Sequence, residues 1–438
     1  MLKSIKGSRF PQLSALDKES FAYATIHDRL PSIVTNVIDL LSRIYFTLNT
    51  QSQIESKDVI NRLANLKYEM ERDRSLTALC DYGEDVDVWN NYLKQVCFHN
   101  NGKLPSFYQS PWLYVECYMY RKIRECFLLS SSFHNFDWFY ESKNKALESS
   151  LRGGSILANL LDLVDYSNLD SIRKYYRTFI LASLWANRCD LSLSAGAQSA
   201  HNPEELLSVD KFNSYLLIDD ISASFDALIA KKSEFTRIDL IADNCGFEII
   251  ADLCLSEFLL RANLCHQVVF HLKSFPWFVS DVTKYDFNTL LWKLQTSEFE
   301  SLKCLSIDIQ RRIFSIESFA DRCDHSIAYH ADTFWTTPFV YADMELVSPL
   351  LFNYLSQSAL LIFKGDLNYR KLTGDIKWDF LTPFSESLLG FSPTSLLALR
   401  TLKADSVAGL QPGQAEKSQE MESNWLNSGS FGVISFVN

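Results

Sequence analysis

The sequence lacks the features typical of membrane proteins, disulfide-bonded proteins and non-specific nucleic-acid binders. No run approaches the ~18 apolar residues of a membrane-spanning helix, and the first residues contain no apolar core of a secretion signal. The ten cysteines include no C-x-x-C pair, which argues against structural zinc and a disulfide framework. No long run of Lys or Arg occurs and the formal net charge is −11, which disfavours nucleic acid as a partner. We therefore expect a protein of a reducing compartment, the cytoplasm or also the nucleus, with no membrane and no obligate protein partner.

The two halves of the chain show different hydrophobic patterns. From Ile33 to about Asp190, apolar residues recur at intervals of three and four, which is typical of amphipathic helices. From Tyr215 onward, short β-branched or aromatic runs alternate with helical stretches, which favours a mostly parallel sheet with helices on both faces. The 438 residues exceed the usual size of one domain. We predict a mainly helical N-terminal domain, residues 1–190, packed on a doubly wound α/β/α core, residues 191–438.

The same patterns predict individual elements. Helices are expected at 33–48, 59–70, 112–128, 156–164, 169–185, 247–260, 288–295 and 346–356, and in a region after Pro393. Strands are expected at 215–218, 238–242, 268–272, 276–280 and 359–364, with a further run at 396–403 and a last strand at 431–436. The polar segment from about 404 to 428 is rich in Pro, Gln and Ser, so we expect a mobile loop there.

Polar side chains follow three of the expected strands. Asp243 and Asn244 follow the second strand, Asp281 follows the run at 276–280, and Asp366 follows the run at 359–364 after a glycine. The carboxyl ends of parallel strands face the crevice in which ligands bind, so these groups are expected to converge. Singly, an Asp or Asn at such a position more often caps the next helix. Together, like charges in one crevice would cost stability without a cation, so the set favours a hard dication such as Mg or Mn.

Cationic groups accompany the last of these carboxylates. The stretch from Gly365 to Lys371 places Arg370 shortly after Asp366, and the run at 396–403 ends in Lys403 where other strands end in carboxylates. Arg370 would hold a phosphate by two parallel hydrogen bonds, and Lys403 would stabilise charge on a transferred phosphoryl group. The alternative is that Arg370 and Lys371 form only the solvated turn after a strand. Acid and cation clusters at one sheet edge favour metal-assisted phosphate chemistry.

Several motifs resemble those of the damage-control phosphatase family, which consists of metal-dependent phosphatases. The matching stretches are Phe21-Ala22-Tyr23, Asp28-Arg29-Leu30-Pro31, 112–121, Asn187-Arg188-Cys189-Asp190-Leu191-Ser192, Asp243-Asn244, Gly246-Phe247-Glu248, 276–281, 364–370 and Arg400-Thr401-Leu402-Lys403. The last resembles the Arg-Thr-x-Lys signature of the subfamily that acts on sugar phosphates. These motifs are spread over nearly the whole chain, and their occurrence in the right order makes the resemblance more specific than any single motif would.

This resemblance implies roles for particular residues. Asp243, Asn244 and Asp281 would bind the divalent metal (Mn, Co, Ni or Mg) and, with Lys403, would be the catalytic residues. The residues that would contact the phosphosugar are Asp366, Leu367, Asn368, Tyr369, Arg370 and Lys403, with Glu116, Asn187 and Arg188 reaching it from the helical side. The implied reaction is hydrolysis of phosphosugars such as fructose 1-phosphate and related hexose phosphates, which removes damaging metabolites.

Two other functions compete with phosphate hydrolysis. The first is an S-adenosylmethionine-dependent carboxyl methyltransferase, an activity also attributed to relatives of this family, but no glycine-rich G-x-G turn follows the first strand. The second is a non-catalytic adaptor with a degenerate enzyme core. Within the phosphatase hypothesis, attack by a water at the metal is favoured over a phosphoaspartyl intermediate, because the chain has no Asp-x-Asp-x-Thr stretch.

Overall fold

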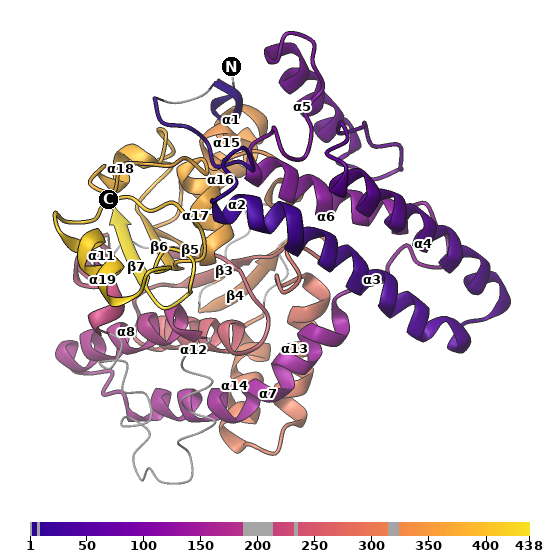
Figure 1. The fold of residues 1–438 in the computed structure, drawn as a ribbon. Helices are drawn as coiled ribbons and strands as arrows, with labels where there is room; N and C mark the ends of the chain where they lie inside the picture. Colours follow the sequence, from indigo (N-terminus) through magenta and orange to yellow (C-terminus); the bar gives the residue numbers. More distant parts are fainter. Residues whose placement is uncertain (1, 7–8, 187–212, 232–234, 314–322, 324) are drawn as a thin grey trace.

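A computed structural model describes residues 2–6, 9–186, 213–231, 235–313, 323 and 325–438 (Figure 1). Helices occupy most of the chain up to residue 186, as the spacing of apolar residues predicts. They are α1 (Lys3–Lys6), α2 (Phe21–Ala24), α3 (Leu30–Ile44), α4 (Thr50–Glu71), α5 (Val86–His99), α6 (Trp112–Leu128), α7 (Tyr140–Asn159) and α8 (Leu169–Leu184). Short helical turns continue three of them: η1 (Thr25–Arg29), η2 (Tyr45–Thr47) and η3 (Leu160–Leu163).

Strands and helices alternate after residue 213. The strands are β1 (Leu216–Asp219), β2 (Arg237–Ile241), β3 (Gln267–His271), β4 (Ser326–His330), β5 (Leu360–Lys364), β6 (Leu396–Thr401) and β7 (Gly432–Val437). The helices are α11 (Ile221–Ala230), α12 (Phe247–Arg261), α13 (Lys284–Thr296), α14 (Glu300–Arg312), α15 (Met344–Val347), α16 (Pro349–Leu355), α17 (Gly365–Thr373), α18 (Phe384–Ser387) and α19 (Gln414–Met421), with turns η5 (Thr333–Thr336) and η6 (Tyr341–Asp343).

All seven strands form one sheet in the order β1-β7-β6-β5-β2-β3-β4. Every neighbouring pair is parallel except β6 and β7. From β2 the chain moves outward through β3 to β4, then returns to place β5 on the other side of β2. The order therefore reverses between β2 and β5, and a crevice at their carboxyl ends is the usual ligand site of such a sheet.

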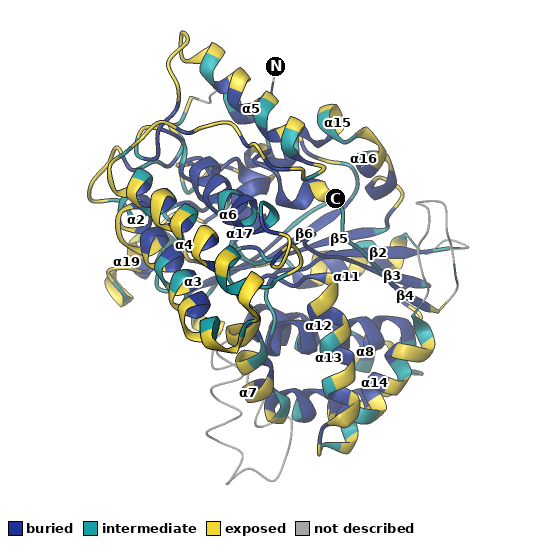
Figure 2. Cartoon of the chain, turned by 90° about the vertical axis from the view of Figure 1, so that its right-hand side faces the viewer, coloured by how far each residue is buried: buried dark blue, intermediate teal, exposed yellow. Residues whose placement is uncertain are grey.

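Helices cover both faces of the sheet, which confirms the predicted α/β fold. Figure 1 shows α7, α8, α12 and α14 on one side and α6, α16 and α17 on the other. Alternate residues of β2 supply the two apolar layers: Ile238 and Leu240 pack in the cluster that contains α8 and α12, and Ile241 packs in the cluster that contains α6 and α17. Figure 2 shows the strands buried between these layers, whereas α3, α4 and α5 expose their outer faces.

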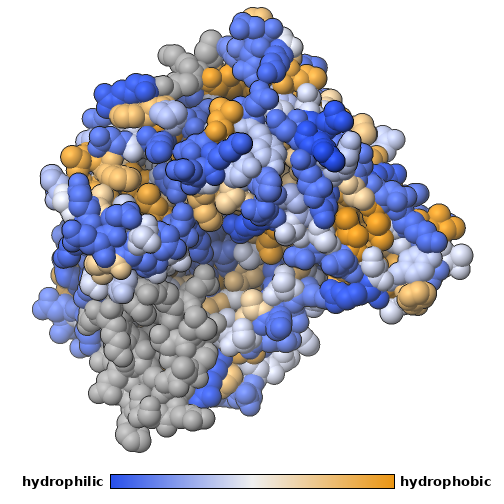
Figure 3. Space-filling view, in the orientation of Figure 1, coloured by the Kyte–Doolittle hydropathy of each residue, from blue (hydrophilic) through white to orange (hydrophobic). Residues whose placement is uncertain are grey.

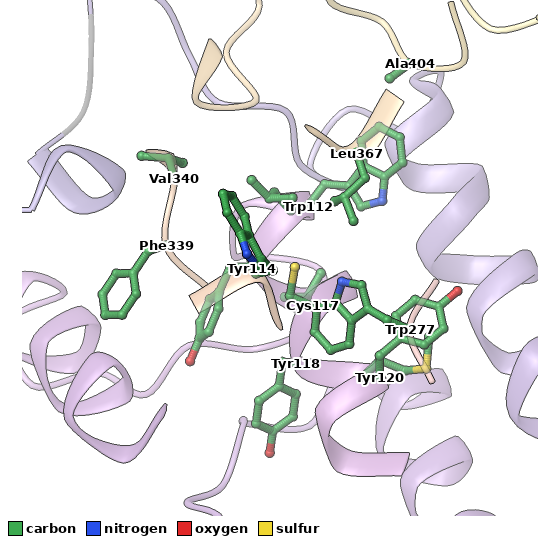
Figure 4. Close-up of a cluster of buried hydrophobic side chains, with 14 of the residues drawn as sticks. Trp112, Tyr114, Cys117, Tyr118, Tyr120, Trp277, Phe339, Val340, Leu367 and Ala404 are labelled. Atoms are coloured by element: carbon green, nitrogen blue, oxygen red, sulfur yellow. The ribbon is translucent and has the colours of Figure 1, made fainter. Parts of the chain in front are cut away.

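Helix α6 joins the N-terminal helices to the sheet layer. Its aromatic side chains, among them Trp112, Tyr114 and Tyr120, are buried in one cluster with Trp277 and Leu367 of the core (Figure 4). One apolar cluster thus includes side chains from both predicted domains. Helices α7 and α8 precede residue 190 but cover the sheet together with α12. The boundary at 190 stays a prediction.

The run at 276–280 is not a strand, contrary to the prediction. Phe278 and Val279 have positive φ angles of 44° and 69°, which no extended strand adopts. Trp277 and Phe278, whose aromatic character suggested a strand, pack against other side chains of the core. Trp277 is fully buried, and Phe278 stacks on Tyr120 with ring centroids 4.6 Å apart. The apolar pattern of 276–280 correctly indicated that Trp277 is buried, but it did not predict the turn of the backbone.

Three further differences concern the last third of the chain. The sequence patterns missed β4, and the region after Pro393 forms β6 rather than a helix. The segment 404–428, expected to be a polar loop, contains α19 and buries Leu410 and Trp425. A few apolar side chains therefore anchor a segment whose composition is mainly polar. None of the described helices combines the length and apolar character needed to cross a membrane.

Candidate functional site

A cavity of about 310 Å³ opens where the strand order reverses. Asp243 and Asn244 reach it from the end of β2, Asp366 from the first turn of α17 after β5, and Lys403 from the segment after β6. Its lining is completed by Ser183, Leu184, Trp185, Ala186, Glu248, Gly365, Leu399, Thr401, Ser428, Gly429 and Ser430. Figure 3 shows that the face seen in Figure 1 is mainly hydrophilic and hollowed near its middle. Four of the predicted site residues thus share one cavity.

Asp281 joins this group through backbone pairing rather than through a strand end. The Cys245 amide donates to the Ser280 carbonyl (2.7 Å), and the Val282 amide donates to the Asp243 carbonyl (2.9 Å). These bonds set Asp281 directly opposite Asn244 in an antiparallel bridge. The left-handed turn at 278–279 brings the chain back to make this pairing. The structure therefore brings the three predicted metal ligands together, although one of the strand assignments behind that prediction was wrong.

The side chain of Asn244 links the two neighbouring carboxylates. Its Nδ2 donates to Asp243 Oδ2 (2.5 Å) and to Glu248 Oε2 (3.0 Å), while Ser280 Oγ donates to its Oδ1. The residue that precedes α12 is Gly246, and no side chain caps that helix. The alternative that Asp243 or Asn244 is simply a helix cap is therefore excluded.

Burial and mutual repulsion act on these carboxylates. Asp243 and Asp281 are 7% and 1% exposed. Burial, and after it the charges of Glu248 and Asp281, raises the pKa of Asp243 well above its usual range. Burial likewise raises the pKa of Asp281 to about 6, although Lys273 opposes the shift. The crevice thus concentrates negative charge that its surroundings compensate only in part.

Two buried lysines provide that partial compensation. Lys273 Nζ lies 3.2 Å from Asp281 Oδ2 and donates to the Ala242 carbonyl (2.8 Å). Lys364 Nζ donates to Glu248 Oε1 (2.9 Å) and to Asp252 Oδ1 (2.8 Å). Both ammonium groups are engaged on the inner side of the crevice. Neither ammonium group forms a hydrogen bond or ion pair with the Asp243 carboxylate, which lines the cavity.

The donor set fits a hard divalent cation. Among the described residues, no three His, Cys, Asp or Glu side chains are arranged as a metal cluster. The candidate set is of another kind, because it combines two carboxylates with the amide of Asn244. Asn244 Nδ2 uses its two N–H groups on Asp243 and Glu248, but as a neutral amide it does not offset the charge of the two carboxylates, so a cation is favoured beside them. Oxygen ligands of this type suit Mg or Mn.

The same cavity is also lined by a cation, Lys403. Asp366 Oδ1 accepts from Arg400 Nε (2.8 Å) and from the Lys403 backbone amide (3.3 Å). Arg400 is fully buried and also donates to the carbonyls of Ser406 and Ala404. The Lys403 side chain is exposed, and its Nζ has no hydrogen bond or ion pair within the described part of the chain. Lys403 is therefore available to an anionic ligand, whereas Arg400 is not.

Three predicted substrate contacts are buried beside the cavity and do not line it. Asn368 Nδ2 donates to the carbonyls of Lys364 (2.6 Å) and Ile241 (3.3 Å), which ties the ends of β5 and β2 together. Leu367 packs in the core (Figure 4). Tyr369 lies under the guanidinium of Arg400, 4.3 Å from it. Their predicted contact with substrate stays a prediction, and their visible role is to shape the crevice.

Arg370 and Glu116 form a buried ion pair. Arg370 Nη1 donates to Glu116 Oε2 (2.7 Å), and its Nε donates to Asp375 Oδ1 (2.8 Å). The guanidinium also stacks on Trp112 at 3.6 Å. Arg370 is thus not the solvated turn of the alternative hypothesis. The pair connects α6 with α17, and its contact with a sugar stays a prediction.

Asn187 and Arg188 lie outside the described residues, so their predicted contact with the sugar also stays a prediction. The last described residues of that segment, 184–186, line the cavity.

Three charged residues of the site, Glu248, Lys364 and Lys273, were given no role from the sequence alone. Glu248 lies in the first turn of α12, and the side chain of Asn244, which precedes the helix, donates to it. Lys364 ends a strand that is otherwise apolar, and a buried ammonium there requires anionic partners, which Glu248 and Asp252 provide. Lys273 follows β3 and gives no comparable local signal, because its partner becomes a neighbour only in the folded chain.

Comparisons with known proteins identify the family of the chain. The sequence profile of the damage-control phosphatase ARMT1-like domain matches residues 25–418. Damage-control phosphatase ARMT1 of Mus musculus is 40% identical over 438 residues, which cover 97% of this chain and 98% of that protein. The proteins of the same name from Danio rerio and Homo sapiens are 39% and 37% identical, each over 97% of this chain and over 96% and 98% of their own lengths. The chain therefore belongs to the damage-control phosphatase ARMT1-like family.

Proposed function

We propose that this protein hydrolyses phosphate monoesters of small sugars with the help of one divalent metal ion. The observation that carries the proposal is the presence of opposite charges in one cavity. Asp243 and Asn244 line the cavity, Asp281 is paired with Asn244 through the backbone, and the unpaired Lys403 lines the same cavity. The similarity to proteins named damage-control phosphatases supports the reaction class.

Asp243, Asn244 and Asp281 are the residues that would hold the metal, which we take to be Mn, Co, Ni or Mg. When bound, such an ion would offset the carboxylate charge, draw in the phosphoryl oxygens and acidify water in the site. Glu248 and Lys364 hold Asn244 and the strand ends in place from behind. The chain itself contributes oxygen atoms, and hydrogen bonds to Asp243 and Glu248 hold the side chain of Asn244 in place.

Lys403 would bind the phosphate. Asp366 fixes the backbone of Lys403 and, through Arg400, the end of β6, so the free ammonium starts from a defined position. A positive charge held near the phosphoryl group stabilises the charge that develops during transfer. The volume of about 310 Å³ is at the small end of ligand sites, which suits a phosphosugar such as fructose 1-phosphate or a related hexose phosphate.

The competing functions have less support. No glycine-rich turn follows β1, and Gly246 stands alone before α12, so no observation favours a methyltransferase. A non-catalytic adaptor does not require a buried acid cluster beside a free lysine.

We further propose that the protein works in the cytoplasm or nucleus, because every cysteine that the structure describes is free. We also propose that it needs no protein partner.

Phosphate release tests the proposal directly. The full chain is assayed with Mn, Co, Ni or Mg against a panel of hexose phosphates, beside Asp243→Asn and the control Asp39→Asn, which changes a carboxylate on the exposed part of α3. The proposal predicts metal-dependent release by the wild type and by Asp39→Asn, with loss in Asp243→Asn. Equal metal-dependent release by Asp243→Asn, or no release by the wild type with any metal, would overturn it.

A further inference from the structure

A larger cavity of about 790 Å³ lies between the N-terminal helices and the segment that leads to Asp281. Its walls come from α3, α6 and the residues around Trp138 on one side, and from 274–276 and the start of α13 on the other. It shares no lining residue with the crevice at the strand ends. The proposed reaction makes no use of this space.

Aromatic rings form much of its wall. Phe127 stacks on Trp138 with centroids 4.6 Å apart and planes 22° apart, and on Phe136 at 5.7 Å and 10°. Phe275 and Tyr285 line the cavity from the core side. Aromatic side chains thus line both sides of the cavity, and they suit a planar ring because aromatic pairs are favourable beyond the apolar area that they bury.

The buried nitrogen of Trp138 adds a polar feature to the same wall. Trp138 is 5% exposed, and its Nε1 has no acceptor among the described residues. A buried N–H without a partner is costly. A ligand that carries an acceptor would satisfy it.

The charged residues of the cavity do not balance one another. Arg124 is only partly exposed, and its guanidinium lies over the Phe275 ring at 4.0 Å with no carboxylate partner in the described chain. The two acids of the lining are already paired with cations outside it. Asp137 contacts Lys143 (2.6 Å), and Glu141 contacts Arg43 (3.0 Å).

Lys284 lines the same cavity and likewise has no ion pair within the described residues. Burial lowers the pKa of Arg124, and the more distant carboxylates of Asp85, Asp81 and Glu84 oppose this shift. Two cations without an ion-pair partner among the described residues therefore line an aromatic-rich space, which favours an anion there.

From these observations we propose that the cavity binds a small organic anion with a planar aromatic ring. The ring lies between the aromatic walls, and the acid group pairs with Arg124 and Lys284. This inference does not depend on the phosphatase proposal. A ligand in this cavity would nevertheless touch the segment that carries a candidate metal ligand. Phe275 lines the cavity, and Asp281 follows it six residues later.

Two fluorescent probes of nearly equal shape separate the aromatic and the anionic parts of the proposal. One is 8-anilino-1-naphthalenesulfonate, an aromatic anion, and the other is N-phenyl-1-naphthylamine, its neutral counterpart. Each is titrated into the metal-free full chain, so the result is independent of the proposed enzyme activity. The variants are Arg124→Gln, Lys284→Gln and the control Arg9→Gln, whose guanidinium also stacks on a phenylalanine but lies outside the cavity.

The proposal predicts saturable binding of the anion by the wild type. Arg124→Gln should weaken it at least about tenfold, since a hydrogen bond to a charged group is lost, and Lys284→Gln about two- to fivefold. Arg9→Gln should bind as the wild type does, and the neutral probe should be insensitive to all three changes. Thermal melts verify that each variant is folded. If Arg124→Gln does not fold, Lys284→Gln provides the test, because its side chain is exposed. Equal affinity of the anion for the wild type and Lys284→Gln, or for the wild type and a folded Arg124→Gln, would overturn the proposal, as would the absence of saturable binding.

Discussion

The carboxylate of Asp243 lies against the α-carbon of Gly365, so closely that a Cβ atom at position 365 would stand 1.8 Å from Asp243 Oδ2. The two residues follow adjacent parallel strands, whose ends are in register at Ile241 and Phe363. Gly365 also has a φ of 82°, a conformation that favours glycine. The packing of the two strand ends thus depends on the absence of a side chain at 365.

Gly365→Ala should weaken metal binding at the candidate site as well as destabilise the fold. The new methyl group must displace the Asp243 carboxylate, so we expect metal affinity to fall at least about tenfold, by the loss of one charged ligand. The matched control is Gly390→Ala, which has a φ of 89° and open space around the Cβ. Both variants should lose about 1–3 kcal/mol of unfolding free energy from backbone strain, measured in denaturant. Equal metal binding by the two variants would contradict the arrangement described.

Lys403→Met should impair phosphate release without changing stability. Its side chain is exposed and makes no contact that supports the fold, whereas loss of one donor to a developing charge costs about a hundredfold in rate or more. The control is Lys417→Met on the exposed side of α19. Steady-state kinetics and melting curves are the measurements. If Lys403→Met were as active as Lys417→Met, the proposed role of Lys403 in binding the phosphate would be contradicted.

Metal affinity should fall as the pH drops through about 6. Burial raises the pKa of Asp281 to about 6, and a protonated carboxyl group is a poor ligand. The metal-free protein should show the opposite trend. Because the folded state holds this proton more tightly than the unfolded state, the contribution of Asp281 to stability is greatest below about pH 4 and is lost as the pH rises towards 6. Calorimetric titrations and melts between pH 4 and 8 test both signs, and a metal affinity independent of pH over that range would contradict the assignment of Asp281.

Glu116→Ala should destabilise the fold strongly. It leaves Arg370 buried with one of its two carboxylate partners missing, and breaking a buried pair in this way costs about 3–5 kcal/mol. Denaturant unfolding measures the loss, and Glu141→Ala, at an exposed ion pair, is the control with a cost of about 1 kcal/mol or less. If Glu116→Ala instead kept its stability and raised only the KM, Glu116 would be a substrate contact, as the family resemblance implies.

Much of the fold could be predicted because local patterns determine it. The spacing of apolar residues located α6 and α12 almost to the residue, and the short hydrophobic runs located β2 and β5. Their ends meet because adjacent parallel strands must end at the same edge. For that reason Asp243 and Asp366 could be assigned to one crevice before any coordinates were considered.

The remainder depends on contacts between residues that are distant in sequence. The motif around Arg370 is consistent with a phosphate ligand, but the guanidinium is fully occupied by Glu116, 254 positions away, and by Asp375. Asn368 serves the ends of two strands, which only the folded chain brings together. The stretch around Phe278 has the composition of a strand and turns because its rings must reach the core on α6.

Titration of the metal-free protein with Mn tests the central claim most directly, using melting temperature and calorimetry on the wild type, Asp243→Asn and Lys403→Met. We expect one ion per wild-type chain and, at a hundredfold excess over the dissociation constant, about 2.7 kcal/mol of added stability. Lys403→Met should bind likewise. Asp243→Asn should be at least as stable as the wild type without metal, because a repelled carboxylate is gone, and should gain nothing from Mn. Full stabilisation of Asp243→Asn by Mn would contradict the account.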